Sequence, residues 1–218
     1  MSRTTQWLLL LVILMSAVSL RFWRIDTLPP GFYIDEADEG LEAWHILTNP
    51  TYRPLFLTSN SGVDPLNSYA NALTFAVFRF FGGDVGPVAM QVTAGCFGVL
   101  GVWALYGLAG ELQQLDQKTS SVSAFPLKPG AFPFFSAATL AVMRWHFHFS
   151  RIGIEPILAP LLWAASLWLF LRGWRMGAWG SFVGSGVGLA AAMYAYQGAW
   201  GRDALNEFLE DVLLPAHG

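Results

Sequence analysis

The chain has 218 residues, of which 54% are apolar, 15% are aromatic and only 12% are charged. So few charges, combined with 22 glycines and ten tryptophans, are typical of a polytopic membrane protein rather than a soluble domain. The net charge of −3 and the lack of a lysine and arginine run argue against nucleic acid as a partner. The single Cys96 excludes an internal disulfide.

The first apolar run extends from Trp7 to Leu20, and Arg3 is the only charge before it. Residues 17–19, Ala-Val-Ser, resemble a signal-peptide cleavage site, which leaves a signal peptide as the alternative to the retained helix that we favour. Residues 21–24, Arg-Phe-Trp-Arg, have the composition of an aromatic and cationic interface anchor. With Arg3 inside, the chain leaves this helix on the outer side.

Residues 24–87 form the predicted first extracytoplasmic loop, which contains an acidic stretch at residues 29–40. The two prolines of this stretch break any helix because proline fixes φ and lacks an N–H donor. A helical pattern resumes from Asp35 to Leu47, and Asp35 is a suitable N-cap residue. This helix is too short to span a bilayer, so we expect it to lie on the membrane surface.

The segment 66–81 decides the predicted topology. It contains Asn67, Asn71 and Arg79 within 16 residues, whereas a spanning helix needs about 20 predominantly apolar residues. We therefore expect a re-entrant or interfacial helix that stays on the outer side.

The later apolar runs predict four further spans, separated by a polar loop at residues 111–130 and a short turn at residues 150–156. These spans are residues 88–109, 131–149, 157–171 and 178–196. The predicted fold is therefore all-α and polytopic, with about five transmembrane helices and interfacial helices in the first loop. Residues 1–200 make up this transmembrane module, and residues 201–218 form a short divergent tail.

The positive-inside rule supports the arrangement in which residues 66–81 do not cross. Four cations then lie in short inner loops: Lys118, Lys128, Arg172 and Arg175. Three arginines stay outside in either arrangement: Arg21, Arg24 and Arg53. The same arrangement brings residues 150–156 to the side that carries the acidic stretch.

The acidic stretch is the first candidate for chemistry. On a helix, Glu36 lies about 100° away from a face that four other carboxylates share. Those four are Asp35, Asp38, Glu39 and Glu42. Crowded carboxylates raise one another's pKa, which suits a general base near neutral pH, or they hold a cation such as Mg²⁺ or Mn²⁺. A solvated helix start is the alternative for Asp38, Glu39 and Glu42.

A second group combines Arg144, His146, His148, Arg151 and Glu155. The fork of donors on an arginine suits phosphate or pyrophosphate oxygens, although Arg144 is equally suited to anchoring at the membrane interface. The two histidines are two residues apart, which is poor spacing for a metal on a helix. A third group, Tyr194, Tyr196, Gln197 and Trp200, is typical of an aromatic interface belt, with stacking on a sugar ring as the alternative.

Three segments together resemble a known family. Residues 29–37 have the pattern Pro-x-Gly-x-Tyr-x-Asp-Glu-Ala, and they are followed by 149–156, FSRIGIEP, and 188–198, GLAAAMYAYQG. In this order they resemble GT-C membrane glycosyltransferases, in the family 39-like branch of protein O-mannosyltransferases and aminoarabinose transferases. The resemblance covers residues 5–200 and matches the N-terminal portion of that family.

The resemblance implies an inverting enzyme in the cell (inner or plasma) membrane, with its catalytic loop extracytoplasmic. It would move a sugar from a polyprenyl-phosphate carrier to a protein, lipid or glycan acceptor. Asp35 would be the general base, Glu36 would orient the acceptor or the base, and Arg151 with Arg144 would bind the phosphate. Three further residues are candidate substrate contacts: Tyr33, Glu155 and Tyr196. Asp35 and Glu36 would hold Mg²⁺ or Mn²⁺ if a metal takes part.

Chains of that family continue for many more helices, which leaves an alternative from another class. The chain would then be a non-catalytic membrane subunit, a transporter fragment or an inactive truncated remnant.

Overall fold

The computed structural model describes residues 2–57, 65–119 and 130–195. Helices account for 77% of these residues, and there is no strand among them. The α-helices, in chain order, are α1 Arg3–Phe22, α2 Ile34–Thr48, α3 Leu66–Phe80, α4 Pro87–Thr119, α5 Phe132–Val142, α6 Arg144–Phe149, α7 Leu158–Met176 and α8 Trp179–Met193, with a 3₁₀ turn η1 at Glu155–Ile157. The predicted all-α fold is confirmed for the described residues.

Three helices are long and apolar enough to cross a membrane: Arg3–Phe22, Pro87–Lys118 and Glu155–Met176. Two more apolar helices, Phe132–Val142 and Trp179–Met193, are shorter than a bilayer requires by themselves. Three spans are therefore supported by length and hydropathy, and the remaining two predicted spans stay a prediction.

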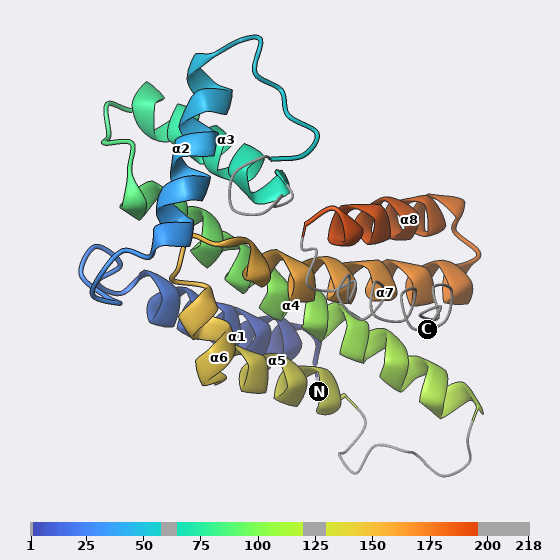
Figure 1. Cartoon of the computed structure of the whole chain (residues 1–218). Coiled ribbons are helices and arrows are strands. Elements are labelled where there is room, and N and C mark those ends of the chain that lie inside the picture. Colours follow the sequence, from blue (N-terminus) through green and yellow to red (C-terminus); the bar gives the residue numbers. More distant parts are fainter. Residues whose placement is uncertain (1, 58–64, 120–129, 196–218) are drawn as a thin grey trace, which may run out of the picture.

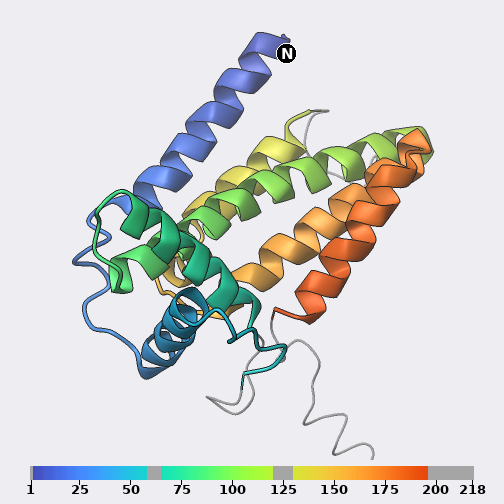
Figure 2. The ribbon, with the colours of Figure 1, turned by 90° about the horizontal axis from the view of Figure 1, so that it is seen from above.

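The helices form a bundle with two distinct ends (Figure 1). Helices α1, α4, α5 and α7 run alongside one another, and α8 folds back along α7 (Figures 1 and 2). Helices α2 and α3 lie beyond one end, which we call the loop end. We call the opposite end, where Gln6, Gln117, Gly130 and Arg172 line one pocket, the far end.

The chain runs from one end of this bundle to the other in alternating directions. Helix α1 leads to the loop end, α4 returns to the far end, and α5 with α6 leads back to the loop end (Figure 1). Helix α7 then runs to the far end, and α8 returns until the Tyr194 hydroxyl donates to the Leu55 carbonyl.

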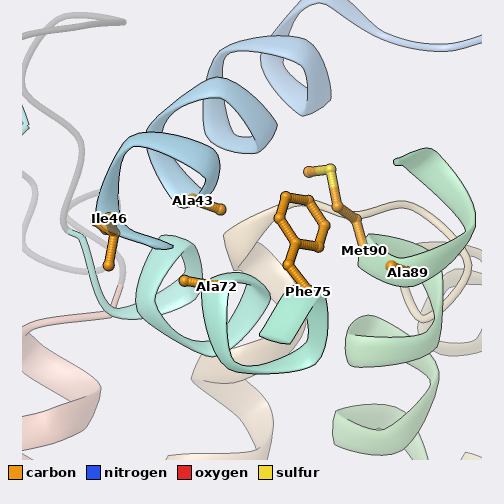
Figure 3. Close-up of a cluster of buried hydrophobic side chains, with 6 residues drawn as sticks. All are labelled: Ala43, Ile46, Ala72, Phe75, Ala89 and Met90. Atoms are coloured by element: carbon orange, nitrogen blue, oxygen red, sulfur yellow. The ribbon is translucent and has the colours of Figure 1, made fainter. Parts of the chain in front are cut away.

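A small apolar core fixes α2 and α3 to the first turns of α4 (Figure 3). Its buried side chains are Ala43 and Ile46 from α2, Ala72 and Phe75 from α3, and Ala89 and Met90 from α4. Helix α3 therefore packs on α2 and on the beginning of α4. The structure confirms a short helix over the predicted segment 66–81, and its position relative to a membrane stays a prediction.

The predicted polar loop at residues 111–130 was wrong at its beginning, because α4 continues to Thr119. Glu111 is 4% exposed and lies inside the bundle, where the Arg175 guanidinium of α7 neutralises it. Nε and Nη2 of Arg175 donate to the two carboxylate oxygens at 2.5 and 2.9 Å. This two-point pair allows the helix to carry a carboxylate within the packed interface.

The segment 131–149, predicted as one span, is not one continuous helix, because Met143 takes an extended conformation between α5 and α6; whether the segment crosses the membrane stays a prediction. In a continuous helix the carbonyl of Ala141 would accept from the N–H of Trp145. Here that carbonyl accepts from Nη1 of Arg21 at 3.2 Å. A buried arginine from α1 thus takes the place of a helical hydrogen bond at the break.

Candidate functional site

The acidic helix α2 begins at Ile34, and Glu36 rather than Asp35 satisfies its first free N–H group. Tyr33 is the N-cap residue, and its N–H donates to Oε2 of Glu36 at 3.1 Å. A glutamate three residues after the N-cap reaches back in this way in many helices. The predicted capping role of Asp35 was wrong. Asp35 instead lies exposed in the first turn, where its charge suits the positive end of the helix dipole.

Glu36 also joins α2 to the distant segment 150–155. It is 1% exposed, and its Oε1 accepts from the Gly153 N–H at 2.7 Å. A Cβ at Gly153 would lie 2.7 Å from the Cβ of Met90 and 3.4 Å from Oε1 of Glu36, which is too close for an alanine without a shift. The absence of a side chain at this position therefore allows α2, α4 and the 150–155 segment to meet.

Glu39, one turn after Glu36, forms a second link to the same segment. It is 3% exposed, its Oε1 accepts from the Glu155 N–H at 3.2 Å, and Asn67 of α3 donates to its Oε2. The same amide of Asn67 donates to the Gly153 carbonyl at 3.3 Å. Burial, and then the hydrogen bond and charge of the Glu155 carboxylate, raise the pKa of Glu39 far above its ordinary value. Glu39 therefore holds a proton at neutral pH.

Two carboxylates that were expected to be solvated are buried. Glu39 is one, and Glu42 is the other at 9% exposure. Glu42 accepts from the Tyr52 hydroxyl at 2.6 Å, and this hydrogen bond, with burial and the charge of Glu42, raises the pKa of Tyr52 to about 12. The pairing of crowded carboxylates that the sequence predicted thus occurs between Glu39 and Glu155, on different segments, and only Asp38 of the three stays partly exposed.

A row of polar side chains on α3 was missed as part of the site. Asn67, Ser68 and Asn71 are all buried, at 0–2% exposure. The Ser68 hydroxyl and both polar atoms of the Asn71 amide have no hydrogen-bond partner among the described residues. Polar residues at positions 67, 68 and 71 of an otherwise apolar segment share one helical face, and this spacing could have indicated a buried polar contact as well as the absence of a membrane span.

Arg151 has a different environment from the one predicted for a phosphate ligand. It is 7% exposed, and its guanidinium donates to carbonyls in the last turn of α1 and in the α1–α2 connection. These bonds run from Nη1 to Leu20 at 2.6 Å, from Nη2 to Trp23 at 2.7 Å, Leu28 at 2.8 Å and Arg24 at 3.3 Å, and from Nε to Leu28 at 3.3 Å. Burial lowers its pKa, although the group keeps its charge at neutral pH. The guanidinium donors of Arg151 are therefore directed at backbone carbonyls, and they anchor the chain between α1 and α2.

The other two arginines near this segment also differ from expectation. Arg144 is exposed on α6, so the structure does not bring the two predicted phosphate ligands into one environment. Arg21 was predicted to be an interface anchor but is 0% exposed. Its Nη2 lies 2.7 Å from Nδ1 of His146, and its Nε donates to the Ser150 hydroxyl at 3.2 Å. A contact across 129 residues leaves no local sequence signal.

The three residues predicted to contact substrate do not form one cluster in the described part of the chain. Tyr33 is exposed beside Asp35, whereas Glu155 is half-buried against Glu39. Tyr196 lies outside the described residues, as do two other members of its group, Gln197 and Trp200, and the tail at residues 201–218.

The pair proposed for Mg²⁺ or Mn²⁺ does not fit a cation. Asp35 is exposed, whereas both oxygens of Glu36 face backbone N–H groups, of Tyr33 and Gly153. Hydrogen-bond donors in these positions leave no oxygen of Glu36 directed at a metal. No group of three or more histidine, cysteine or acidic side chains could hold a metal within the part of the chain that the structure describes.

An apolar groove borders the acidic helix on its outer side. It has a volume of about 360 Å³ between α2, α3 and the beginning of α4. Its wall includes Phe32, Leu41, Trp44, Phe75, Pro87 and Met90. Leu41 and Trp44 are 59% and 40% exposed, so α2 turns an apolar face outward and its glutamates inward.

Comparison of the chain with protein-family models, with curated proteins and with solved structures finds no match. The geometry of the loop end therefore carries the functional argument together with the sequence motifs.

Proposed function

We propose that the chain is an inverting glycosyltransferase of the GT-C class, or the N-terminal module of one. It would move a sugar from a polyprenyl-phosphate carrier to a protein, lipid or glycan acceptor. The observation that carries the proposal is the 2.7 Å hydrogen bond between Glu36 and the Gly153 N–H. It joins the two segments, residues 29–37 and 149–156, whose sequences separately resemble motifs of that class.

Asp35 is the proposed general base. Its carboxylate is exposed at the start of α2, where it can take the proton of an acceptor hydroxyl. The acceptor oxygen then forms a bond to the anomeric carbon while the bond from that carbon to the phosphate oxygen breaks on the opposite face. Glu36 positions this turn and does not itself react, because both of its oxygens accept from backbone N–H groups.

The leaving phosphate needs a cation and the prenyl chain needs an apolar surface. Of the two predicted phosphate ligands, Arg144 is the one with an exposed guanidinium, and we assign the phosphate to it. Arg151 is assigned to positioning, since it already donates to four backbone carbonyls. The groove beside Leu41 and Trp44 is the proposed seat of the first prenyl units.

The proposed orientation puts the loop end outside the cell. Three cations, Lys118, Arg172 and Arg175, are near the far end of α4 and α7, as inner positions require. Burial of Arg21 and Arg151 removes two arginines that would otherwise count against this orientation. With α1, α4 and α7 as spans, α5–α6 and α8 are the proposed fourth and fifth crossings.

The test is a transfer assay on membranes that contain the chain, with a panel of polyprenyl-phosphate hexoses as donors. The Asp35→Asn variant should lose transfer by about 10²- to 10⁴-fold, the usual contribution of a general base. Asp38→Asn, one turn further along α2 and partly exposed, is the matched control and should keep its activity. Equal activity of Asp35→Asn and the wild-type chain would remove Asp35 from the mechanism. A wild-type chain that transfers no sugar would favour the non-catalytic membrane role.

A further inference from the structure

The far end of the bundle holds a second polar site, separate from the acidic helix. Helices α1, α4, α5 and α7 converge there on a pocket of about 370 Å³. Four of the six glutamines in the chain line it: Gln6, Gln113, Gln114 and Gln117. Gln113 is buried and Gln6 is partly exposed, whereas Gln114 and Gln117 are exposed, so the pocket offers several amides that can both donate to and accept from a polar ligand.

The wall of this pocket is held in place by its own contacts. The Gly130 N–H donates to Oε1 of Gln113 at 2.9 Å, which fixes that buried side chain. The indole of Trp168 packs directly on Gly107, where a Cβ would overlap the ring. Beside them, the buried Glu111 is neutralised by Arg175. The pocket is therefore formed before any ligand enters it.

The charge of the pocket is set by Arg172. The Glu111 carboxylate that lines the wall is already paired with Arg175, so these two charges cancel. Arg172 lies one turn before Arg175 on α7, is exposed, and has no hydrogen-bond or ion-pair partner among residues 2–57, 65–119 and 130–195. The wall thus presents one uncompensated guanidinium, which binds phosphate oxygens through a fork of donors.

The distance along α4 puts this pocket at a membrane interface. Met90 packs at the loop end and Gly110 lines the pocket, so a helical rise of about 1.5 Å per residue separates them by about 30 Å. This is about the thickness of the hydrocarbon core of a bilayer. Helix α4 is long and apolar enough to span, and a bilayer crossed by it would have its headgroups at the level of the pocket, in the leaflet opposite the acidic loop.

We propose that this pocket binds a phosphate ester that bears free hydroxyl groups, the chemistry that a phosphatidylglycerol headgroup presents. Arg172 binds the phosphate, and the glutamine amides, which both donate and accept, bind the hydroxyls. Tyr106 and Trp168 supply an apolar surface for the carbon skeleton of the headgroup. The site does not depend on the proposed transfer reaction.

Native mass spectrometry of the detergent-solubilised chain tests this site with three lipids and one soluble ester. Phosphatidylglycerol should bind more tightly than phosphatidylcholine, whose headgroup has no hydroxyl and carries no net charge. The Arg172→Gln variant should weaken phosphatidylglycerol binding by about tenfold, the scale of one charge-assisted hydrogen bond. Arg79→Gln changes an exposed arginine at the end of α3, away from the pocket, and should have no effect.

Two further arms separate the components of the proposal. Gln114→Leu should lower the affinity for phosphatidylglycerol to that for phosphatidic acid, which lacks the headgroup hydroxyls. Glycerol 3-phosphate that binds as tightly as the lipid would support the same chemistry with a soluble source. The proposal is overturned if the chain binds phosphatidylglycerol and phosphatidylcholine equally tightly. It is also overturned if Arg172→Gln and Arg79→Gln weaken phosphatidylglycerol binding to the same extent.

Discussion

Glu36 and Glu39, one turn apart on α2, are both buried but are held by different chemistry. Glu36 accepts from two backbone N–H groups, one at each carboxylate oxygen. Glu39 meets a second carboxylate, Glu155, and its pKa is raised. We therefore expect the same substitution to have a larger effect on stability at Glu36 than at Glu39.

Glu36→Gln should destabilise the fold by about 1–3 kcal/mol, because its amide N–H₂ would face a backbone N–H and leave one buried donor unsatisfied. Glu39→Gln should destabilise the fold less than Glu36→Gln, because its amide can donate to the Glu155 carboxylate, although it gives up one of the two hydrogen bonds that Glu39 accepts from the Glu155 N–H and Asn67. Chemical or thermal unfolding of both variants in one detergent measures the difference. Equal losses would show that Glu39 is ionised in the folded chain.

The pH dependence of stability independently tests whether the Glu39 carboxyl is protonated in the folded chain. The folded chain keeps a proton on Glu39, whereas the unfolded chain releases it above the ordinary pKa of 4.5. The folded state thus binds more protons than the unfolded state, so stability should fall as pH rises from about 4.5 through neutrality. Glu39→Gln should flatten the profile of Tm between about pH 5 and about pH 9. A wild-type profile that rises over this window would contradict the assignment.

The sequence indicates most directly those features of the candidate site that lie within one segment. The acidic stretch and the exposure of Asp35 at its start are local features. The burial of Glu36 and Glu39 depends on Gly153 and Asn67, which lie 117 and 28 positions away. No property of the stretch itself indicated which carboxylates would face these partners.

At the scale of the elements, the two faces of α2 are placed in the opposite way to those of a surface helix on a soluble protein: its acidic face is buried and its apolar face is exposed. Its glutamates face α3 and the 150–155 segment, whereas Leu41 and Trp44 face outward. Leu41 and Trp44 stay exposed in the structure, as suits the membrane-surface position that remains a prediction for this helix. The polar face was misjudged because a carboxylate can be buried only where donors from other elements meet it.

Gly153 is the position at which these elements approach most closely. Gly153→Ala should destabilise the loop end by about 1–3 kcal/mol, because its Cβ would lie 2.7 Å from the Cβ of Met90 and would separate α4 from the segment. Gly180→Ala is the matched control, since a Cβ at Gly180 has no atom within 4 Å. Unfolding of the two variants, followed by hydrogen exchange at α2, measures the effect.

A second substitution distinguishes crowding from other effects of the added methyl group. Met90→Gly in the Gly153→Ala background should recover part of the lost protection at α2, because it removes the Met90 Cβ that the new Cβ meets at 2.7 Å. Strict additivity of the two losses would contradict the steric explanation.

At the scale of the whole molecule, the sequence predicted the alternating path better than the helix ends. Hydropathy indicated the apolar runs, but the break at Met143 is accompanied by a hydrogen bond from the buried Arg21, and the continuation of α4 to Thr119 by the pairing of Glu111 with the partly exposed Arg175. Such partners come from helices distant in the sequence. A hydropathy pattern along one segment therefore cannot indicate where they interrupt or extend a helix.

The number of membrane crossings determines whether the C-terminal ends of α4 and α7 lie on the same side of the membrane. If only α1, α4 and α7 cross, three passes put the end of α7 on the side of the acidic loop and opposite the end of α4. If α5–α6 and α8 also cross, the ends of α4 and α7 share the opposite side. We propose five crossings, because Gln117 of α4 and Arg172 of α7 line one pocket at the far end.

Single cysteines introduced into a Cys96→Ser background show directly on which side of the membrane each helix end lies. A membrane-impermeant maleimide applied to intact cells should label Asp35→Cys, whereas Gln117→Cys and Met176→Cys should be labelled only after the membrane is permeabilised. All three positions are exposed in the fold, so access depends on the membrane and not on packing. Labelling of Met176→Cys from outside, with Gln117→Cys protected, would reduce the crossings to three and would require α5–α6 and α8 to leave the bundle geometry.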